Sequence, residues 1–259
     1  ADNHPLIIPL IAETGGQNVM IADSSALTEQ VVQDAVYSAF NSAGQRCSAL
    51  RVLFLQQEVA DKMIEMLIGA MQELSIGNPG CYTTDIGPVI NHSAVNQLSD
   101  HVKRMKQQAR VLYQMPLLED LHNGSFFSPC LIELEALSQL EQENFGPVLH
   151  VIRYRSPELE SVIEAINATG YGLTLGIHSR INSTIRMIQQ NVRVGNIYVN
   201  RNMIGAVVGV QPFGGMGLSG TGPKAGGPRY LHRFAIEQTV TTNSAAIGGN
   251  AGLMAQDLR

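Results

Sequence analysis

A cysteine and a glutamate near the start of the chain are the residue types that covalent catalysis needs. Cys47 stands in the run Gly44-Gln45-Arg46-Cys47-Ser48, and Glu13 comes shortly before the pair Gly15-Gly16. A thiolate is a strong nucleophile, and a neighbouring cation such as Arg46 lowers a thiol's pKa. A glutamate beside a flexible Gly-Gly turn has the freedom that a general base needs. The two segments therefore predict a nucleophile and a base.

Plainer interpretations exist for both residues. From composition alone a cysteine is most often a buried, inert side chain, and a glutamate is most often a capping or salt-bridging group. The polar surroundings of Cys47 favour the catalytic interpretation. Cys81 and Cys130 have no such surroundings, so we expect both to be structural.

Two further motifs bear on cofactor binding. Glu143-Asn144-Phe145-Gly146-Pro147 offers a carboxylate for a hydroxyl pair such as that of a ribose, with an aromatic ring nearby, although it would also serve as a plain turn. Gly215–Gly220 matches the spacing GxGxxG, but no strand leads into it and no strand-turn-helix unit follows. We therefore interpret 215–220 as a mobile glycine loop and not as a dinucleotide-binding fingerprint.

Hydrophobic periodicity predicts alternating strands and helices for most of the chain. The expected strands are 6–12, 18–23, 51–56, 111–115, 127–134, 147–154, 173–178 and 195–200, and the expected helices are 28–44, 59–74, 91–109, 156–166 and 182–190. This alternation predicts an α/β fold, a doubly wound and mostly parallel sheet with helices on both faces, hence three layers. In such sheets functional groups gather at the carboxyl ends of the strands, so we expect the site there.

The C-terminal part has a different character. Residues 201–228 are rich in glycine and irregular, which in a compact domain usually indicates function. A short helix is expected over 229–236. Residues 238–243 are polar and β-branched, as in an exposed strand that awaits a partner, and 244–259 form a small, flexible tail.

Composition narrows the class of protein. The 259 residues are 44% hydrophobic and 15% charged, with a net charge of −5 and no cluster of Lys and Arg, so we expect no nucleic-acid partner. No apolar run is long enough to span a membrane, and the start lacks the features of a signal peptide. The three cysteines form no CxxC pair and the seven histidines no ligand pair, so we expect no metal site. A reducing cytoplasm suits this cysteine usage best.

Four motifs in order resemble the aldehyde dehydrogenase superfamily. They are Glu-Thr-Gly-Gly (13–16), Gly-Gln-Arg-Cys (44–47), Glu-x-Phe-Gly-Pro (143–147) and Pro-Phe-Gly-Gly (212–215). Within it, the runs Cys47-Ser48-Ala49, 198–202, 205–209 and 219–228 resemble the L-glutamate γ-semialdehyde (1-pyrroline-5-carboxylate) dehydrogenases, in particular the modules of bifunctional proline-utilisation proteins.

The resemblance implies a role for each site residue. Cys47 would attack the aldehyde to give a thiohemiacetal, transfer of hydride to NAD⁺ would leave a thioester, and Glu13 would activate the water that hydrolyses it. The remaining assignments follow the same match: Glu143, Phe145, Thr14 and Gly15 for NAD binding, and Ser48, Gly205, Ala206 and Phe213 for the small-molecule aldehyde substrate.

The resemblance also implies a division of the chain. Residues 1–12 would be a remnant of the cofactor-binding domain, 13–220 the catalytic domain, and 221–243 a return helix with an oligomerisation strand that makes a homo-oligomer. Because the chain has no initiator Met and Glu13 stands so early, we expect a fragment that lacks the N-terminal half of the family, binds NAD⁺ weakly or not at all, and is weakly active or inactive. FAD would belong only to the absent proline dehydrogenase part of a bifunctional parent.

Two alternatives stay open. The same scaffold with another aldehyde substrate is the first, against which the small residues Ser48 and Gly205-Ala206 argue, because they suit a carboxylate. The second is a non-catalytic module whose retained property is oligomerisation through 238–243.

Overall fold

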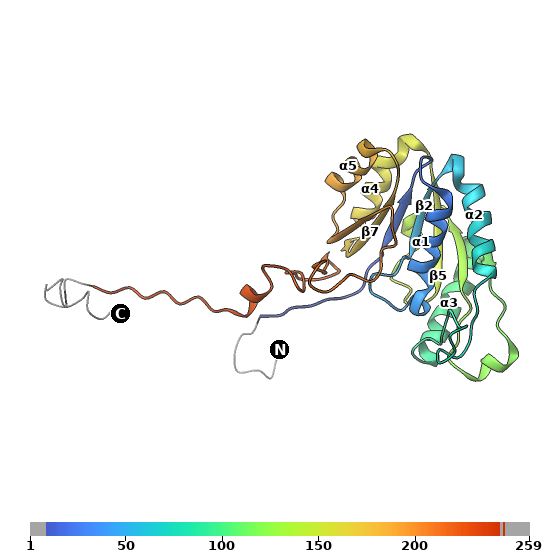
Figure 1. The fold of residues 1–259 in the computed structure, drawn as a ribbon, viewed down its shortest axis with the longest axis horizontal. Coiled ribbons are helices and arrows are strands. Elements are labelled where there is room, and N and C mark those ends of the chain that lie inside the picture. Colours follow the sequence, from blue (N-terminus) through green and yellow to red (C-terminus); the bar gives the residue numbers. More distant parts are fainter. Residues whose placement is uncertain (1–8, 244–245, 247–259) are drawn as a thin grey trace.

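The computed structural model describes residues 9–243 and residue 246. The main elements, in chain order, are β1 (Val19–Ala22), α1 (Thr28–Phe40), β2 (Val52–Gln56), α2 (Gln57–Gln72), α3 (His92–Gln108), β3 (Arg110–Gln114), β4 (Cys130–Leu134), β5 (Val148–Tyr154), α4 (Leu159–Ala168), β6 (Tyr171–Gly172), β7 (Thr174–His178), α5 (Asn182–Asn191), β8 (Asn196–Val199) and β9 (Met216–Gly217). Figure 1 shows them as one α/β body, from which the C-terminal segment runs outward.

Seven strands form the central sheet in the order β3-β4-β5-β2-β1-β7-β8. All neighbours are parallel except β3 and β4, which run antiparallel at one edge. Pairing continues on both sides of β1, with Met20 beside Leu53 of β2 and Gly176 of β7. The mostly parallel α/β fold expected from the sequence is therefore confirmed.

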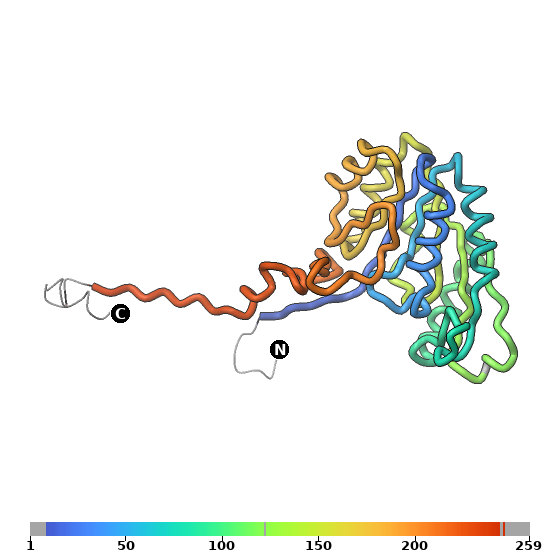
Figure 2. The backbone as a smooth tube through the Cα atoms, in the orientation of Figure 1, coloured from blue at the N-terminus to red at the C-terminus, as the bar shows by residue number. Residues whose placement is uncertain are grey.

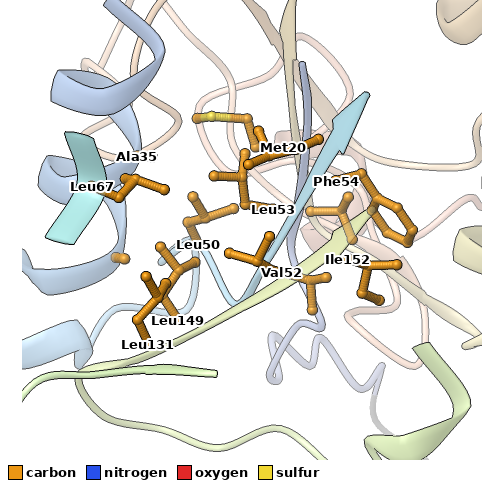
Figure 3. Packing of buried hydrophobic residues seen from close by; sticks show 14 of the residues in the cluster. Met20, Ala35, Leu50, Val52, Leu53, Phe54, Leu67, Leu131, Leu149 and Ile152 are labelled. Carbon is orange, nitrogen blue, oxygen red and sulfur yellow. The ribbon is translucent and has the colours of Figure 1, made fainter. Parts of the chain in front are cut away.

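The central strands are apolar on both faces, which explains why they form the middle of the sheet. Every residue of β1, β2 and β7 is buried, as is typical of parallel sheets covered by helices on each side. Figure 3 shows the two faces: Leu53, Leu131 and Leu149 point towards Ala35 of α1 and Leu67 of α2, whereas Phe54 and Ile152 point away from them.

The opposite face is covered by α3, α4 and α5. Successive strand residues point to opposite faces, so His150 of β5 points away from the side that Leu149 shares with α1 and α2. His150 meets His101 of α3, with 2.9 Å between their Nε2 atoms, which places α3 on this second face. Figure 1 shows α4 and α5 on the side away from α1 and α2. The sheet therefore lies between two layers of helices.

The segments with Glu13, Cys47 and Glu143 each precede a strand of the central sheet, whereas Gly205, Ala206 and Phe213 follow β8. Glu13 comes before β1, Cys47 before β2 and Glu143 before β5. Because neighbouring parallel strands begin at the same edge, these segments meet at the amino ends of the strands. The expectation that the candidate residues gather at the carboxyl ends is therefore wrong for these three. At the carboxyl edge of β1 and β7, Asp23 is instead bound by Ser25 and Ser179 of the chain itself.

The two ends of the chain differ from expectation. Residues 9–12 of the expected strand 6–12 are not in a strand, and residues 6–8 lie outside the described part of the chain. The helix expected over 229–236 is a single 3₁₀ turn, Leu231–Phe234. Residues 235–243 carry no helix or strand, and the expected tail, apart from residue 246, lies outside the described part.

The glycine loop 215–220, which we expected to be mobile, is held by ordered contacts with other segments. Met216 and Gly217 form β9, which pairs with β6, and the Ser219 hydroxyl accepts a hydrogen bond of 3.0 Å from the Gly172 amide. The loop also pairs with the N-terminal segment: Ala12 and Thr221 exchange two hydrogen bonds of 3.0 Å. Figure 2 shows these distant segments running side by side. Within the described residues, no helix combines the length and the apolar character needed to cross a membrane.

Candidate active site

Cys47 lies in an exposed position on the loop that leads from α1 into β2. A 3₁₀ segment, Asn41–Gly44, ends α1, and Gly44 has a φ of +65°, which turns the chain towards Cys47. The Gln45 side chain fixes the loop, because its amide donates to the Pro88 carbonyl at 3.2 Å and accepts from the Ile90 amide at 2.8 Å. The loop expected after a helix is therefore confirmed, and the contacts of Gln45 with Pro88 and Ile90 hold it in position.

The pKa of the Cys47 thiol is raised. Although Cys47 as a whole is exposed, partial burial of the thiol is the main cause, and the nearby carboxylates of Glu143 and Glu13 raise the pKa further, against hydrogen bonds from the Ser48 and Cys47 amides that lower it. Arg46 does not supply the expected cation at the sulfur, because its Nε donates to the Ser42 hydroxyl at 3.1 Å. The prediction that Arg46 and a polar shell lower this pKa is wrong.

Glu13 is held by the glycine loop. It forms a lone β-bridge with Gly220, and the adjacent Thr14 amide donates to the Ser219 carbonyl at 3.2 Å. Burial raises the pKa of the Glu13 carboxyl, while a hydrogen bond from the Gly215 amide opposes this. A carboxylate with a raised pKa is a better base at neutral pH. The Thr14 hydroxyl donates to the Leu218 carbonyl, so this candidate cofactor contact is already engaged in the fold.

Glu143 is clamped between a buried arginine and the Gly-Gly turn. Its Oε1 accepts from Arg51 Nε at 3.2 Å and Nη2 at 2.9 Å, and its Oε2 accepts from the Gly16 amide at 3.0 Å. Gly15 has no room for a side chain, because a Cβ there would lie 1.9 Å from Glu143 Oε2. The predicted cofactor residues Gly15 and Glu143 are therefore in direct contact.

Arg51 also holds the Cys47 loop. Only 1% of its side chain is exposed. Its Nη1 donates to the carbonyls of Gly44 at 2.7 Å and Gly146 at 3.2 Å, and its Nη2 donates to the Arg46 carbonyl at 3.1 Å. One side chain thus connects the loop before β2 with the loop before β5.

Asn18, at the start of β1, is a second buried anchor. Its amide nitrogen donates to the carbonyls of Cys47 at 2.6 Å and Ala49 at 2.9 Å, and its Oδ1 accepts from the Thr174 amide at 3.2 Å. Sequence reasoning identified neither Asn18 nor Arg51 as site residues. The signal that could have identified them is a polar residue at the start of an otherwise apolar strand.

The residues beside Glu143 fit the nicotinamide-ribose end of a dinucleotide. The Phe145 ring is 44% exposed and lies 5.1 Å from the Arg51 guanidinium, so an apolar face is open next to a carboxylate. Three of the roughly four acceptor positions of the Glu143 carboxylate are used, which leaves one for a ligand hydroxyl. Gly15 keeps the adjacent backbone free of side-chain atoms.

Comparison with known proteins decides the family. The pattern of the family described as "Aldehyde dehydrogenase family" matches residues 2–240. The chain belongs to the aldehyde dehydrogenase family. It is 60% identical over 231 residues to "Bifunctional protein PutA" of Klebsiella aerogenes, a match that covers 87% of this chain and 18% of that protein. The chain thus spans about a fifth of this relative's length.

Solved structures of the aldehyde dehydrogenase family agree with this fold. A crystal structure of bifunctional proline utilization A (PutA) protein matches with a TM-score of 0.88 and 62% identity, covering 96% of this chain and 25% of that one. A 1-pyrroline-5-carboxylate dehydrogenase from Thermus, solved with bound NAD, matches with a TM-score of 0.81 and 34% identity, covering 86% and 43%.

The predicted substrate residues of this aldehyde dehydrogenase are connected to the Cys47 loop through other residues. Ser48 is buried next to Cys47. Ser38 of α1 accepts the Leu50 amide through its carbonyl at 3.0 Å and the Met203 amide through its hydroxyl at 3.1 Å, so the segment that leads to Gly205 and Ala206 begins beside the Cys47 loop. Gly205 has a φ of +75°.

Phe213 lies in the segment that also supports Glu13. It is half-buried and exchanges two main-chain hydrogen bonds with Ala225, of 3.0 and 2.8 Å. Asn196 of β8 fixes this segment, because its amide nitrogen donates to the Pro212 carbonyl at 3.0 Å and its Oδ1 accepts the Gly214 amide at 3.4 Å. The roles of Phe213, Ser48, Gly205 and Ala206 stay predictions.

Other features lie outside this site. Burial raises the pKa of Cys130 to about 12, as suits a structural residue, whereas Cys81 is exposed and is not a core residue. An apolar cavity of about 470 Å³ opens between α1 and α2 beside Tyr37 and Met66, and the predicted site residues do not line it. No group of possible metal ligands occurs within the described residues.

Proposed function

We propose that this chain is the catalytic region of an NAD-dependent dehydrogenase that oxidises L-glutamate γ-semialdehyde to L-glutamate in proline catabolism. The observation that carries the proposal is the meeting of Cys47 with the carboxylates of Glu13 and Glu143, which come from three separate segments but share one electrostatic environment. Family membership and the dehydrogenase activity of the Thermus relative supply the reaction class.

The raised pKa of Cys47 assigns a first task to Glu13. The thiol is largely protonated at neutral pH, so its proton has to leave as the sulfur attacks the aldehyde carbon. Glu143 is committed to Arg51 and Gly16, whereas Glu13 has a raised pKa and takes this proton. The attack forms a thiohemiacetal, and the Cys47 amide donates to its oxyanion.

NAD⁺, when bound, supplies the acceptor for the hydride that leaves the substrate carbon. Glu143 and Phe145 would hold its nicotinamide-ribose end. The thioester left on Cys47 is then hydrolysed by a water molecule from which Glu13 takes a proton, and the sulfur departs as the carboxylate product forms. Glu13 is exposed, so it releases the thiol proton to solvent before water attacks, and it thus acts as a base in both halves of the reaction.

The substrate follows from the residues around the nucleophile. Ser48, Gly205 and Ala206 are small, and their hydroxyl and main-chain amides suit the α-carboxylate of glutamate semialdehyde. Phe213 lines the aldehyde end. Comparing oxidation of glutamate semialdehyde with that of an unsubstituted aliphatic aldehyde tests this assignment, and equal kcat/KM values would favour a general aldehyde dehydrogenase.

Hydrolysis of p-nitrophenyl acetate tests the nucleophile and the base without the cofactor. We expect a burst of p-nitrophenol as Cys47 is acylated, followed by slow turnover as Glu13 activates water. Cys47→Ser should lose the burst, whereas Glu13→Gln should slow the turnover that follows it by about 10²-fold or more. Cys81→Ser, which removes the other exposed thiol, is the matched control. A burst that survives Cys47→Ser would refute the assignment.

The C-terminal segment supports a second property, assembly into a homo-oligomer. Leu231, Phe234, Ile236 and Val240 are each more than half exposed although they are large and apolar. Figure 1 shows this segment running away from the body. An extended segment that exposes large apolar side chains suits addition to a sheet edge of a second copy, as the expected oligomerisation strand requires.

A further inference from the structure

Arg51 uses every donor that it has. A guanidinium carries five N–H groups, and the five hydrogen bonds of Arg51 reach the carbonyls of Gly44, Arg46 and Gly146 and, twice, Glu143 Oε1. No N–H remains for a substrate or cofactor. Any contribution of Arg51 to the reaction therefore passes through the groups that it holds.

The groups that Arg51 holds come from both sides of the site. Gly44 and Arg46 belong to the Cys47 loop, and Glu143 and Gly146 belong to the loop before β5. Gly44 and Gly146 approach so closely that a Cβ on Gly44 would lie 2.2 Å from the Gly146 carbonyl oxygen. Arg51 therefore draws the two loops together at one point.

The acceptor geometry of Glu143 limits what it can bind. Oε1 accepts twice from Arg51 and Oε2 accepts once from Gly16, so of about four acceptor positions the single free one is on Oε2. A ribose diol that binds a free carboxylate uses both oxygens. With Arg51 in place, Glu143 accepts one hydroxyl only.

We propose that Arg51 is the positioning residue of this site: it orients Glu143 so that one Oε2 acceptor faces the cofactor ribose, and its charge offsets Glu143 beside the Cys47 sulfur. The ribose part rests on the proposed function. The connection between Arg51, Glu143 and Cys47 stands on the contacts of this chain alone.

The charges around Cys47 allow the electrostatic role of Arg51 to be measured. Glu13 and Glu143 act on the thiol, Arg46 is directed to Ser42, and the buried Arg51 interacts electrostatically with Cys47. A guanidinium stays charged throughout the pH range in which a thiol titrates. Removing Arg51 therefore leaves the thiol exposed to carboxylates that nothing offsets.

Alkylation of Cys47 by iodoacetamide as a function of pH tests this role. The full chain with Cys81→Ser serves as background, and mass spectrometry follows modification of Cys47. Glu143→Gln should lower the pH midpoint of alkylation. The double variant Glu143→Gln with Arg51→Met removes both members of the ion pair. Its midpoint should lie about one pH unit above that of Glu143→Gln, which makes alkylation below the midpoint roughly tenfold slower. Equal midpoints for these two variants would overturn the electrostatic role.

Arg51→Lys separates position from charge. Lysine keeps the positive charge but offers three donors without the planar fork. The midpoint should stay near that of the background, while the p-nitrophenyl acetate burst slows about tenfold because the Cys47 loop is less well held. An unchanged burst would refute the positioning role, and this variant also decides the case if the double variant does not fold. If the background shows no burst at all, the proposed function fails, while the alkylation midpoints still test Arg51.

Discussion

At the scale of single residues, buried polar side chains hold the Cys47 loop. The Cys47 carbonyl is bound by Asn18, and the carbonyls of Gly44 and Arg46 are bound by Arg51. Each buried carbonyl left without a donor would cost about 1–3 kcal/mol, so these contacts restrict the loop to one conformation. Cys47, the proposed nucleophile, is thus positioned through its main chain by Asn18 and Arg51.

Gly44 is the residue at which this positioning can be disturbed most directly. Gly44→Ala would place a Cβ 2.2 Å from the Gly146 oxygen, at a φ of +65° that alanine adopts with strain. We expect a loss of about 1–3 kcal/mol in the free energy of unfolding, together with slower acylation of Cys47. Urea denaturation and the p-nitrophenyl acetate burst measure the two effects.

Gly69→Ala is the matched control. Gly69 lies in α2 with no heavy atom within 4 Å of an added Cβ, so alanine should raise stability by up to about 1 kcal/mol through its better helix propensity. Acylation of Cys47 should not change. Equal effects of the two substitutions would show that Gly44 has no special role.

At the scale of elements, a chain of hydrogen bonds joins α3 to β5 and to the start of β2. The Arg51 carbonyl can only accept, so His150 Nδ1 donates to it at 2.9 Å. His150 Nε2 is then the acceptor of His101 Nε2–H at 2.9 Å, and His101 Nδ1 accepts from Arg104 at 3.4 Å. Both histidines are therefore neutral in the fold.

This histidine pair predicts a loss of stability in acid. Burial lowers the pKa of His101 to about 4 and that of His150 to about 3, whereas an unfolded histidine titrates near pH 6.5. Between these values the unfolded chain binds more protons, so the free energy of unfolding falls as the pH falls below about 6.5. By pH 5 the loss is about 2 kcal/mol for each histidine.

His101→Gln tests this dependence, because glutamine keeps a donor for His150 but does not titrate. Its stability should fall less between pH 7 and 5 than that of the parent chain, by about 2 kcal/mol in denaturant titrations. His92→Gln, at the exposed start of the same helix, should leave the slope unchanged. A parallel pH profile for His101→Gln and the parent would contradict a neutral pair.

At the scale of the whole molecule, the site lies at the amino edge of the sheet and the exposed C-terminal segment extends away from the body. The edge strands β3 and β8 each have one side without a strand partner among the described residues. Such an edge accepts an added strand. The extended segment of one chain and a sheet edge of another are therefore complementary.

The mass in solution tests assembly. Size-exclusion chromatography with light scattering should give a multiple of the 28.0 kDa chain mass. Ile236→Asp with Val240→Asp should give the single-chain mass, because a charge opposes burial of the segment at an interface. Ile90→Asp, which changes an equally exposed apolar residue of the body, should leave the oligomer intact. A parent chain of single-chain mass would refute the proposal.

The sequence by itself determined the family and the fold class. The strands 173–178 and 195–200 and the helices 91–109 and 182–190 could be predicted closely because their periodicity depends on local burial. Cys47 and Glu13 could be selected because their residue types stand in recognisable motifs.

Only the tertiary structure decided on which edge of the sheet these residues meet and which charges surround them. The edge depends on strand order, which no local pattern contains. The raised pKa of Cys47 depends on burial and on Glu143, nearly a hundred residues away in the chain, and not on the adjacent Arg46. Arg51 and Asn18 gain their roles for the same reason, because their partners come together only when β1, β2 and β5 pair.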